Sequence, residues 1–303
     1  MSGWGRRCAA GAVAFGLVAG CQGVDEPLDP AEGQPVVGLI RVTQAAPESS
    51  SASKSASAPC PQDRRVISGG ARITGGNGEV RLTSLLPVEG ENSFRARADQ
   101  DADGYAGDWG LQVYALCAEP LIGLDYVRGG VAGSVDYRGV KTAFAQCDPG
   151  QDLIGGGIEA PGSEGWIVSH FRLVDGEGAP TVSGQTTEAF GFPQREEAPV
   201  AHAVCADPIG RFYTEGTKVT GGAPDDTLTA AISCTQGRGL LGADIQVGRR
   251  AEDIFSIPAS EFAVTGLWAD ADLRTVTLTA RRMKGSGVEW YLAGNAQCGT
   301  VLQ

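Results

Sequence analysis

The stretch that decides the fold begins CPQDRRVISGGARI at residues 60–73 and ends WGLQVYALC at residues 109–117. Its closing segment places apolar residues at every second position up to Cys117, a period typical of a half-buried β-strand. Its opening segment carries the apolar pair Val66-Ile67 and then the glycine pair Gly69-Gly70. Glycines inside a strand pattern indicate a β-bulge or a close approach of two backbones. The stretch therefore predicts two strands and a tight backbone contact at the first of them.

The chain makes this plan three times at a nearly constant spacing. The opening cysteines lie 87 residues apart and the closing ones 88 and 93 apart: Cys60, Cys147 and Cys234 open the units, and Cys117, Cys205 and Cys298 close them. The apolar pair recurs as Leu153-Ile154 and Leu240-Leu241. A repeat at a fixed period is stronger evidence for the fold than any local sequence pattern. Helix signals are sparse and turn clusters recur every 8–12 residues or so. We expect an all-β protein of three homologous antiparallel units, each about 85 residues long.

Five regions follow from the repeat and the composition. We expect a signal peptide at 1–20, a disordered tether at 21–36, and β repeats at 37–120, 121–207 and 208–303. The joints between repeats, such as Ala118-Glu119-Pro120 and Ala206-Asp207-Pro208, are too short to hold compact units apart. We therefore expect the units to pack in pseudo-threefold fashion, either as a β-prism-like trio of sheets or as small sandwiches in contact.

The six cysteines of the body are typical of an exported, disulfide-bonded protein. A repeat should pair its cysteines equivalently in every unit, and two schemes do so. In the first, each unit closes on itself: Cys60–Cys117, Cys147–Cys205 and Cys234–Cys298. In the second, neighbouring units are joined in a ring: Cys117–Cys147, Cys205–Cys234 and Cys60–Cys298. We favour the first because it would let each unit fold alone, with about 4 kcal/mol of stabilisation from each closed loop.

The N-terminus has the order of an export signal. Arg6 and Arg7 precede a short apolar run that ends Val18-Ala19-Gly20-Cys21. The run is too short to span a bilayer as a mature helix. It resembles the lipobox of bacterial lipoproteins, which implies lipidation of Cys21, export, and anchoring to a membrane of the cell envelope. In a Gram-negative cell the membrane would be the outer one, because Gln22 is not Asp. The alternative is an ordinary signal peptide cleaved nearby, with Cys21 left as an unpaired thiol.

The repeat resembles one found in secreted proteins of actinobacteria and related bacteria, whose members are largely uncharacterised. The stretches Cys60-Pro61-Gln62 and Leu153-Ile154-Gly155-Gly156-Gly157 carry this resemblance best. The third unit departs from it, with Thr235 after its cysteine and Ala243-Asp244 in place of glycines. The resemblance implies export and a β fold, and it brings no activity.

One acidic loop has the spacing of a calcium site. Asp99, Asp101 and Asp103 precede Gly104, and alternate carboxylates of this kind converge on one hard cation. The closing glutamate of an EF-hand is absent because Gly110 stands there, and the other repeats lack the loop. We therefore favour an acidic hairpin loop, with a calcium site as the alternative, and calcium is the single cofactor that the sequence suggests.

Motifs for catalysis are missing from the sequence. The chain has two histidines, His170 and His202, and neither neighbours a Cys/His cluster. Every body cysteine is already used by a disulfide, so few groups are left for a metal site or a nucleophile. There is no P-loop, dinucleotide fingerprint or nucleophile elbow. We do not expect an enzyme.

The charge is acidic, with 36 acidic residues against 24 basic ones and a formal value of −12. Loss of Arg6 and Arg7 with the signal leaves 22 basic residues and a charge of −14. Such a chain disfavours nucleic-acid binding. We expect a structural or interaction lipoprotein, held to the membrane by its lipid, with cell-wall or extracellular polysaccharide or envelope proteins as partners. The alternative is a lectin-like, carbohydrate-binding module, which exposed and clustered Trp166, Trp268 and Tyr105 would favour.

Overall fold

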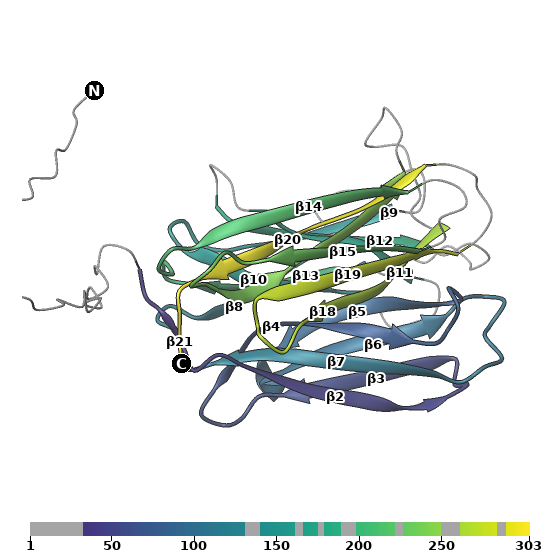
Figure 1. Cartoon of the computed structure of the whole chain (residues 1–303), viewed down its shortest axis with the longest axis horizontal. Coiled ribbons are helices and arrows are strands. Elements are labelled where there is room, and N and C mark those ends of the chain that lie inside the picture. The colour runs from purple at the N-terminus through teal and green to yellow at the C-terminus, as the bar shows by residue number, and fades with distance from the viewer. Residues whose placement is uncertain are drawn as a thin grey trace, which may run out of the picture.

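The structure is a computed structural model that describes residues 33–130, 140–160, 166–174, 179–188, 198–221, 227–249, 261–283 and 289–303. Its regular elements are β-strands, apart from the short 3-10 helix η2 (Glu89–Glu91) (Figure 1). No helix in this part of the chain is long and apolar enough to cross a membrane. The signal segment and Cys21 lie outside the described residues, as does the side chain of Trp166.

Among the described residues, units 1 and 2 consist of six strands each and unit 3 of seven. Unit 1 consists of β2 (Ile40–Ser49), β3 (Ser53–Pro59), β4 (Arg65–Thr74), β5 (Val80–Val88), β6 (Ser93–Gln100) and β7 (Trp109–Ala118). Unit 2 consists of β8 (Asp125–Gly129), β9 (Val140–Gln146), β10 (Asp152–Glu159), β11 (Trp166–Val174), β12 (Thr181–Glu188) and β13 (Val200–Ala206). Unit 3 consists of β14 (Tyr213–Gly221), β15 (Thr227–Ser233), β16 (Gly239–Ala243), β17 (Ile245–Arg249), β18 (Phe262–Ala269), β19 (Thr275–Arg282) and β20 (Trp290–Gly299).

Every large sheet is shared between two units. Sheet I has the order β3-β6-β5-β10-β13-β8, sheet II the order β14-β20-β17-β11-β12-β9 with β16 also on β20, and sheet III the order β15-β19-β18-β4-β7-β2. Each unit is thus divided between two sheets, and the sharing closes in a circle from unit 1 through units 2 and 3 back to unit 1. The two halves of a unit also face each other, as the contacts of β3 with β7 and of β4 with β5 show. The units are therefore small sandwiches whose sheets continue into their neighbours.

The disulfides follow the pairing within each unit: Cys60–Cys117, Cys147–Cys205 and Cys234–Cys298, each with a Cα–Cα distance of 5.7 Å. The units are not structurally separate, however, because each unit completes its sheets with strands of its neighbours. Cys60 follows β3 in sheet I, whereas Cys117 lies on β7 in sheet III. The disulfides therefore connect sheets and do not connect neighbouring strands of one sheet.

Equivalent bulges of the three units meet in the centre of the molecule. The register shifts at Ile67 in β4, at Ile154 in β10 and at Leu241 in β16, and all three side chains are fully buried. The strands β4, β10 and β16 contact one another pairwise. A Cβ atom at Gly155 would collide with the carbonyl oxygen of Ile67, and one at Gly242 with that of Ile154. Glycine is therefore required after the apolar pair in units 2 and 3, whereas unit 1 has Ser68 at this position.

The chain ends are held together at one end of the molecule. The strands β1 (Val36–Val37) and β21 (Val301–Leu302) pair in parallel. The side-chain amide of Gln34 donates to the carbonyl oxygens of Ile122 (2.9 Å) and Asp207 (3.0 Å), one in each joint between units. Its Oε1 accepts the N–H of Ile122 at 2.8 Å. One glutamine near the start of the body thus ties both joints together.

We expect Gly155→Ala to lower the free energy of unfolding by about 1–3 kcal/mol, because the added methyl forces the central bulges apart. Urea denaturation of the oxidised protein measures this. The control is Gly130→Ala, where a Cβ meets nothing within 4 Å. Equal effects of the two substitutions would show that the central contact tolerates a side chain.

Candidate functional site

Each sheet contains a seam where the strands of one unit meet those of the next, and each seam is short. In sheet I, Ile158 and Glu159 of β10 pair with Leu85 and Ser84 of β5. In sheet III a single pair joins β18 to β4, and in sheet II two pairs join β11 to β17. The strands separate beyond these paired residues. Whether the space at each seam is filled therefore depends on the side chains there.

The seam of sheet III is covered by an aromatic cluster. The rings of Tyr114 and Trp268 form an edge-to-face pair, with centroids 5.3 Å apart. The guanidinium carbon of Arg72 lies 4.1 Å from the centroid of Trp268, and that of Arg41 lies 5.6 Å from it. These arginines make cation–π contacts with the ring. A hollow of about 240 Å³ remains beside them, and its lining includes Thr265, Thr277, Thr279 and Asp270.

The tryptophans and Tyr105 do not form an exposed platform in the part of the chain that the structure describes. Trp109 and Trp290 are buried in the core. Trp268 and Tyr105 are half-buried and pack against that core. These described aromatic side chains are therefore not clustered on an exposed face.

The seam of sheet II is closed by a buried carboxylate. Asp244 stands where the other units have Gly70 and Gly157, and it is fully buried. It accepts hydrogen bonds from the N–H of Leu173 in unit 2 (2.8 Å) and from the N–H of Asn295 in unit 3 (2.7 Å). The side-chain amide of Asn295 donates to it as well, at 3.0 and 3.2 Å. Burial raises the pKa of Asp244 to about 6, although these hydrogen bonds act in the opposite direction.

The seam of sheet I is open. A cavity of about 350 Å³ lies between the end of β5 and the half-sheet β10-β13-β8. Unit 1 supplies Arg95 and an apolar wall, and unit 2 supplies Tyr126 and a set of polar side chains. The lining includes Leu86, Pro87, Val88, Glu89, Arg95, Tyr126, Val127, Arg128, Glu159 and His202. We call this cavity the seam groove.

Glu159 is the centre of the charges in the seam groove. Its Oε2 lies 3.4 Å from Nη2 of Arg128 and 3.4 Å from Nε2 of His202. His202 lowers the pKa of Glu159 most, partial burial opposes it, and Arg128 and Arg95 lower it further. Glu159 is therefore ionised at neutral pH. The imidazole of His202 is nine-tenths buried and lies at the wall of the groove beside this carboxylate.

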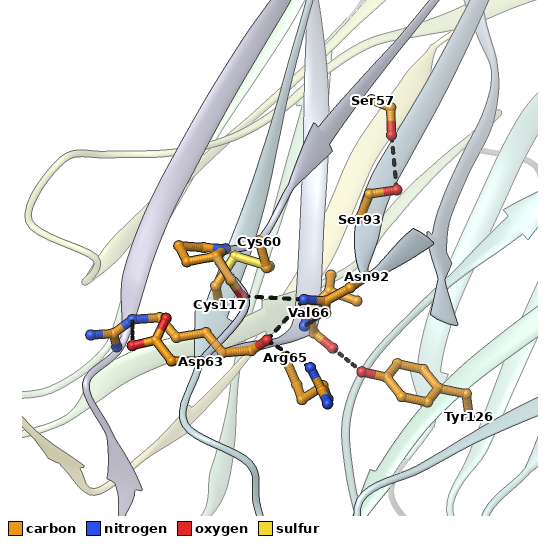
Figure 2. The surroundings of a disulfide bond; sticks show 11 residues. Ser57, Cys60, Asp63, Arg65, Val66, Asn92, Ser93, Cys117 and Tyr126 are labelled. Carbon is orange, nitrogen blue, oxygen red and sulfur yellow. Dashed lines mark hydrogen bonds and ion pairs between the residues drawn. A yellow bond between two sulfur atoms is a disulfide. The ribbon is translucent and has the colours of Figure 1, made fainter. Parts of the chain in front are cut away.

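Tyr126 forms part of the wall and is fixed at its far end. Its hydroxyl donates a 2.6 Å hydrogen bond to the carbonyl oxygen of Val66 in unit 1, beside the Cys60–Cys117 disulfide (Figure 2). The N–H of Val66 is held in turn by Oδ1 of Asn92 at 3.0 Å. Burial raises the pKa of Tyr126 to about 12, so the hydroxyl stays a donor. The ring cannot leave the groove without breaking a contact between units.

A second hollow of about 250 Å³ adjoins the seam groove along sheet I. The two share Leu86, Arg95 and Glu159. The second hollow adds small hydroxyls and one further arginine, namely Ser53, Ser55, Ser84 and Arg97. Together they form a continuous depression across the outer face of sheet I, from β8 to β3.

The acidic loop is arranged differently from a calcium site. Asp99 is buried and accepts hydrogen bonds from Thr83 Oγ1 (2.8 Å) and Arg97 Nε (3.0 Å). Oδ1 of Asp101 accepts the N–H groups of Asp103 and Gly104, both at 3.1 Å. Among the described residues no group of three or more His, Cys, Asp or Glu side chains is placed to hold a metal ion. Calcium binding at this loop therefore stays a prediction, and the described side chains form no ligand cluster that supports it.

Sequence reasoning did not single out Arg95, Arg128 or Glu159, because no motif joins them. They come from β6, β8 and β10 of two units. The third unit offered one sequence signal that the seams differ. Asp244 replaces a glycine of the repeat there and marks the seam of sheet II as different from the others. No family model matches the chain, and no curated protein sequence matches it. The site is therefore defined by its geometry.

We expect the buried Asp244 to make stability depend on pH. Its pKa is raised from 3.8 to about 6, so the folded state favours the protonated form. The associated stability is present below about pH 4 and is lost as the pH rises through 6. The shift of about two pKa units corresponds to roughly 3 kcal/mol.

The measurement is urea unfolding between pH 4 and pH 7.5 for the native chain and for Asp244→Asn. The stability advantage of the native chain over the variant should shrink by about 3 kcal/mol across this range. A constant difference between the two proteins would contradict the raised pKa.

Proposed function

We propose that the protein is an exported, lipid-anchored protein of the bacterial envelope with a structural or interaction role. The observation that carries this proposal is the set of three disulfides, one in each unit, that join different sheets. Such bonds form and persist in oxidising compartments. They also stiffen a body whose sheets already pass from unit to unit, which suits a scaffold.

The position of the tether is compatible with an anchor at one end of the body. The N–H of Gln34 donates to the carbonyl oxygen of Pro208 at 2.8 Å, at the end where both joints meet. A chain from Cys21 to Gly33 reaches at most roughly 40 Å when fully extended. A lipid on Cys21 would therefore keep this end of the body close to the membrane surface.

We expect Cys21→Ser to move the protein from the detergent phase to the aqueous phase on phase separation, or to leave it unprocessed, because the lipid is attached through that sulfur. Cys8→Ser is the control, since Cys8 lies inside the signal segment and should leave with it. Detergent partitioning that is unchanged by Cys21→Ser would contradict the lipobox interpretation.

Carbohydrate binding is the second candidate function, and the seam groove is the observation that favours it. The groove combines an aromatic ring and aliphatic side chains with paired charged groups on one outer face of the molecule. Binding sites for small molecules are typically concave and largely apolar, with a few polar groups that fix orientation. An interaction role and sugar binding are compatible, because a polysaccharide can be the partner.

A further inference from the structure

We infer that the seam groove and the adjoining hollow bind a neutral oligosaccharide that lies across the outer face of sheet I. The inference rests on the carbohydrate-binding candidate above and names the site, the ligand class and the residues. It does not depend on the lipid anchor.

The first step is the comparison of the three seams. The position opposite Gly70 in β7 is Tyr114, which Trp268 covers. The equivalent residue in β20 is Asn295, which is bound to Asp244. In β13 it is His202, opposite Gly157, and here the seam groove remains open. Asp244 and Asn295 thus fill the seam of sheet II, and the seam of sheet III keeps a hollow of about 240 Å³ beside Trp268. The seam of sheet I has a larger cavity than this, of about 350 Å³, and a second hollow adjoins it.

The second step is the apolar wall. Leu86, Pro87 and Val88 of unit 1 line the groove, as do Tyr126 and Val127 of unit 2. The C–H faces of a sugar ring pack well on such surfaces, and a tyrosine offers a large apolar area with little conformational freedom to lose. The hydrogen bond to Val66 holds Tyr126 in place before a ligand arrives. The wall is therefore preorganised.

The third step is the balance of charge. Arg128 is paired with Glu159, Arg95 with Glu91, and Arg97 with Asp99. The exposed fractions of the Arg128, Glu159 and Arg95 side chains are 67%, 39% and 38%, so a ligand can reach all three. The charges nearly cancel, whereas their donors and acceptors remain available side by side. Hydroxyl groups, which both donate and accept, match this pattern better than an anion does.

The fourth step is length. The cavity of about 350 Å³ is near the lower end of the range for small-molecule sites. The adjoining hollow continues it past Arg95 towards the serines of β3. The exposed hydroxyls of Ser53 and Ser55 and the guanidinium of Arg97 can serve a second sugar unit. The ligand is therefore a chain of sugars, with one unit against Tyr126 and the next above Ser53 and Ser55.

The test uses the full chain in a detergent without a sugar head group. Cellotetraose, chitotetraose and maltotetraose are titrated, and binding is followed by saturation-transfer NMR and calorimetry. We expect at least one of them to bind, and inorganic phosphate not to compete. Glu159→Gln and Arg128→Ala should each weaken binding about tenfold or more, as expected for loss of a hydrogen bond to a charged group.

The ring of Tyr126 is tested by a matched pair. Tyr126→Ala should abolish binding, whereas Tyr126→Phe keeps the ring and should retain it. The controls are Glu215→Gln on β14 and Arg274→Ala on the turn before β19, both outside the groove. Thermal unfolding of every variant shows that it is folded. If Tyr126→Ala does not fold, Glu159→Gln still tests whether the seam groove binds the sugar.

Three results would overturn the inference: no tetrasaccharide binds, binding survives the substitutions of Glu159, Arg128 and Tyr126, or phosphate displaces the sugar. The last would indicate an anion site. None of them affects the partitioning of Cys21→Ser, so failure of the groove and failure of the lipid anchor are distinguishable.

Discussion

The contact on which the rest of the structure depends is the meeting of three backbone bulges in the centre. A peptide carbonyl of one unit approaches the Cα atom of the next so closely that a glycine is needed at Gly155 and Gly242. Because β4, β10 and β16 all take part, their directions are fixed relative to one another. Those directions decide where each half-sheet points, and hence which strand of the neighbouring unit can complete it. Large apolar side chains could not substitute here, because the constraint is on backbone distance and not on buried area.

The shared sheets and the disulfides hold the units together in different directions. Hydrogen bonds run along a sheet from one unit into the next, although only one or two residue pairs carry each seam. The disulfides act across the other direction, between the two sheets to which a unit contributes. Because these seams are short, side chains add contacts across them. In sheet III the contact is made by a tryptophan that arginines cover, and in sheet II by a buried carboxylate. Sheet I uses the hydroxyl of Tyr126 at its margin and leaves a groove beside it.

The sequence predicts the all-β class, the cysteine pairs and the close approach at the glycines, because all three follow from patterns that recur at a fixed spacing. It does not predict that each unit is divided between two sheets. Strand partners such as Leu85 and Ile158 belong to different repeats, and nothing local to either residue specifies the other. The groove is hidden for the same reason: Arg95, Arg128 and Glu159 are ordinary surface charges until the seam brings them together. The departure of Asp244 from the repeat is the one local sign that the seams differ.

The circular sharing of strands has a consequence for how the chain folds as it is synthesised. Sheet I can form once the second unit has emerged, but β4 and β11 stay unpaired at their seams until β18 and β17 arrive from the third. The strand β1 must wait for β21 at the far end of the chain. Pairing between such distant segments is slow, and open strand edges invite association with other chains. A disulfide that closes within 57–64 residues can form far earlier. The covalent bonds thus hold each emerging unit near its final shape during the interval in which hydrogen bonds cannot yet do so.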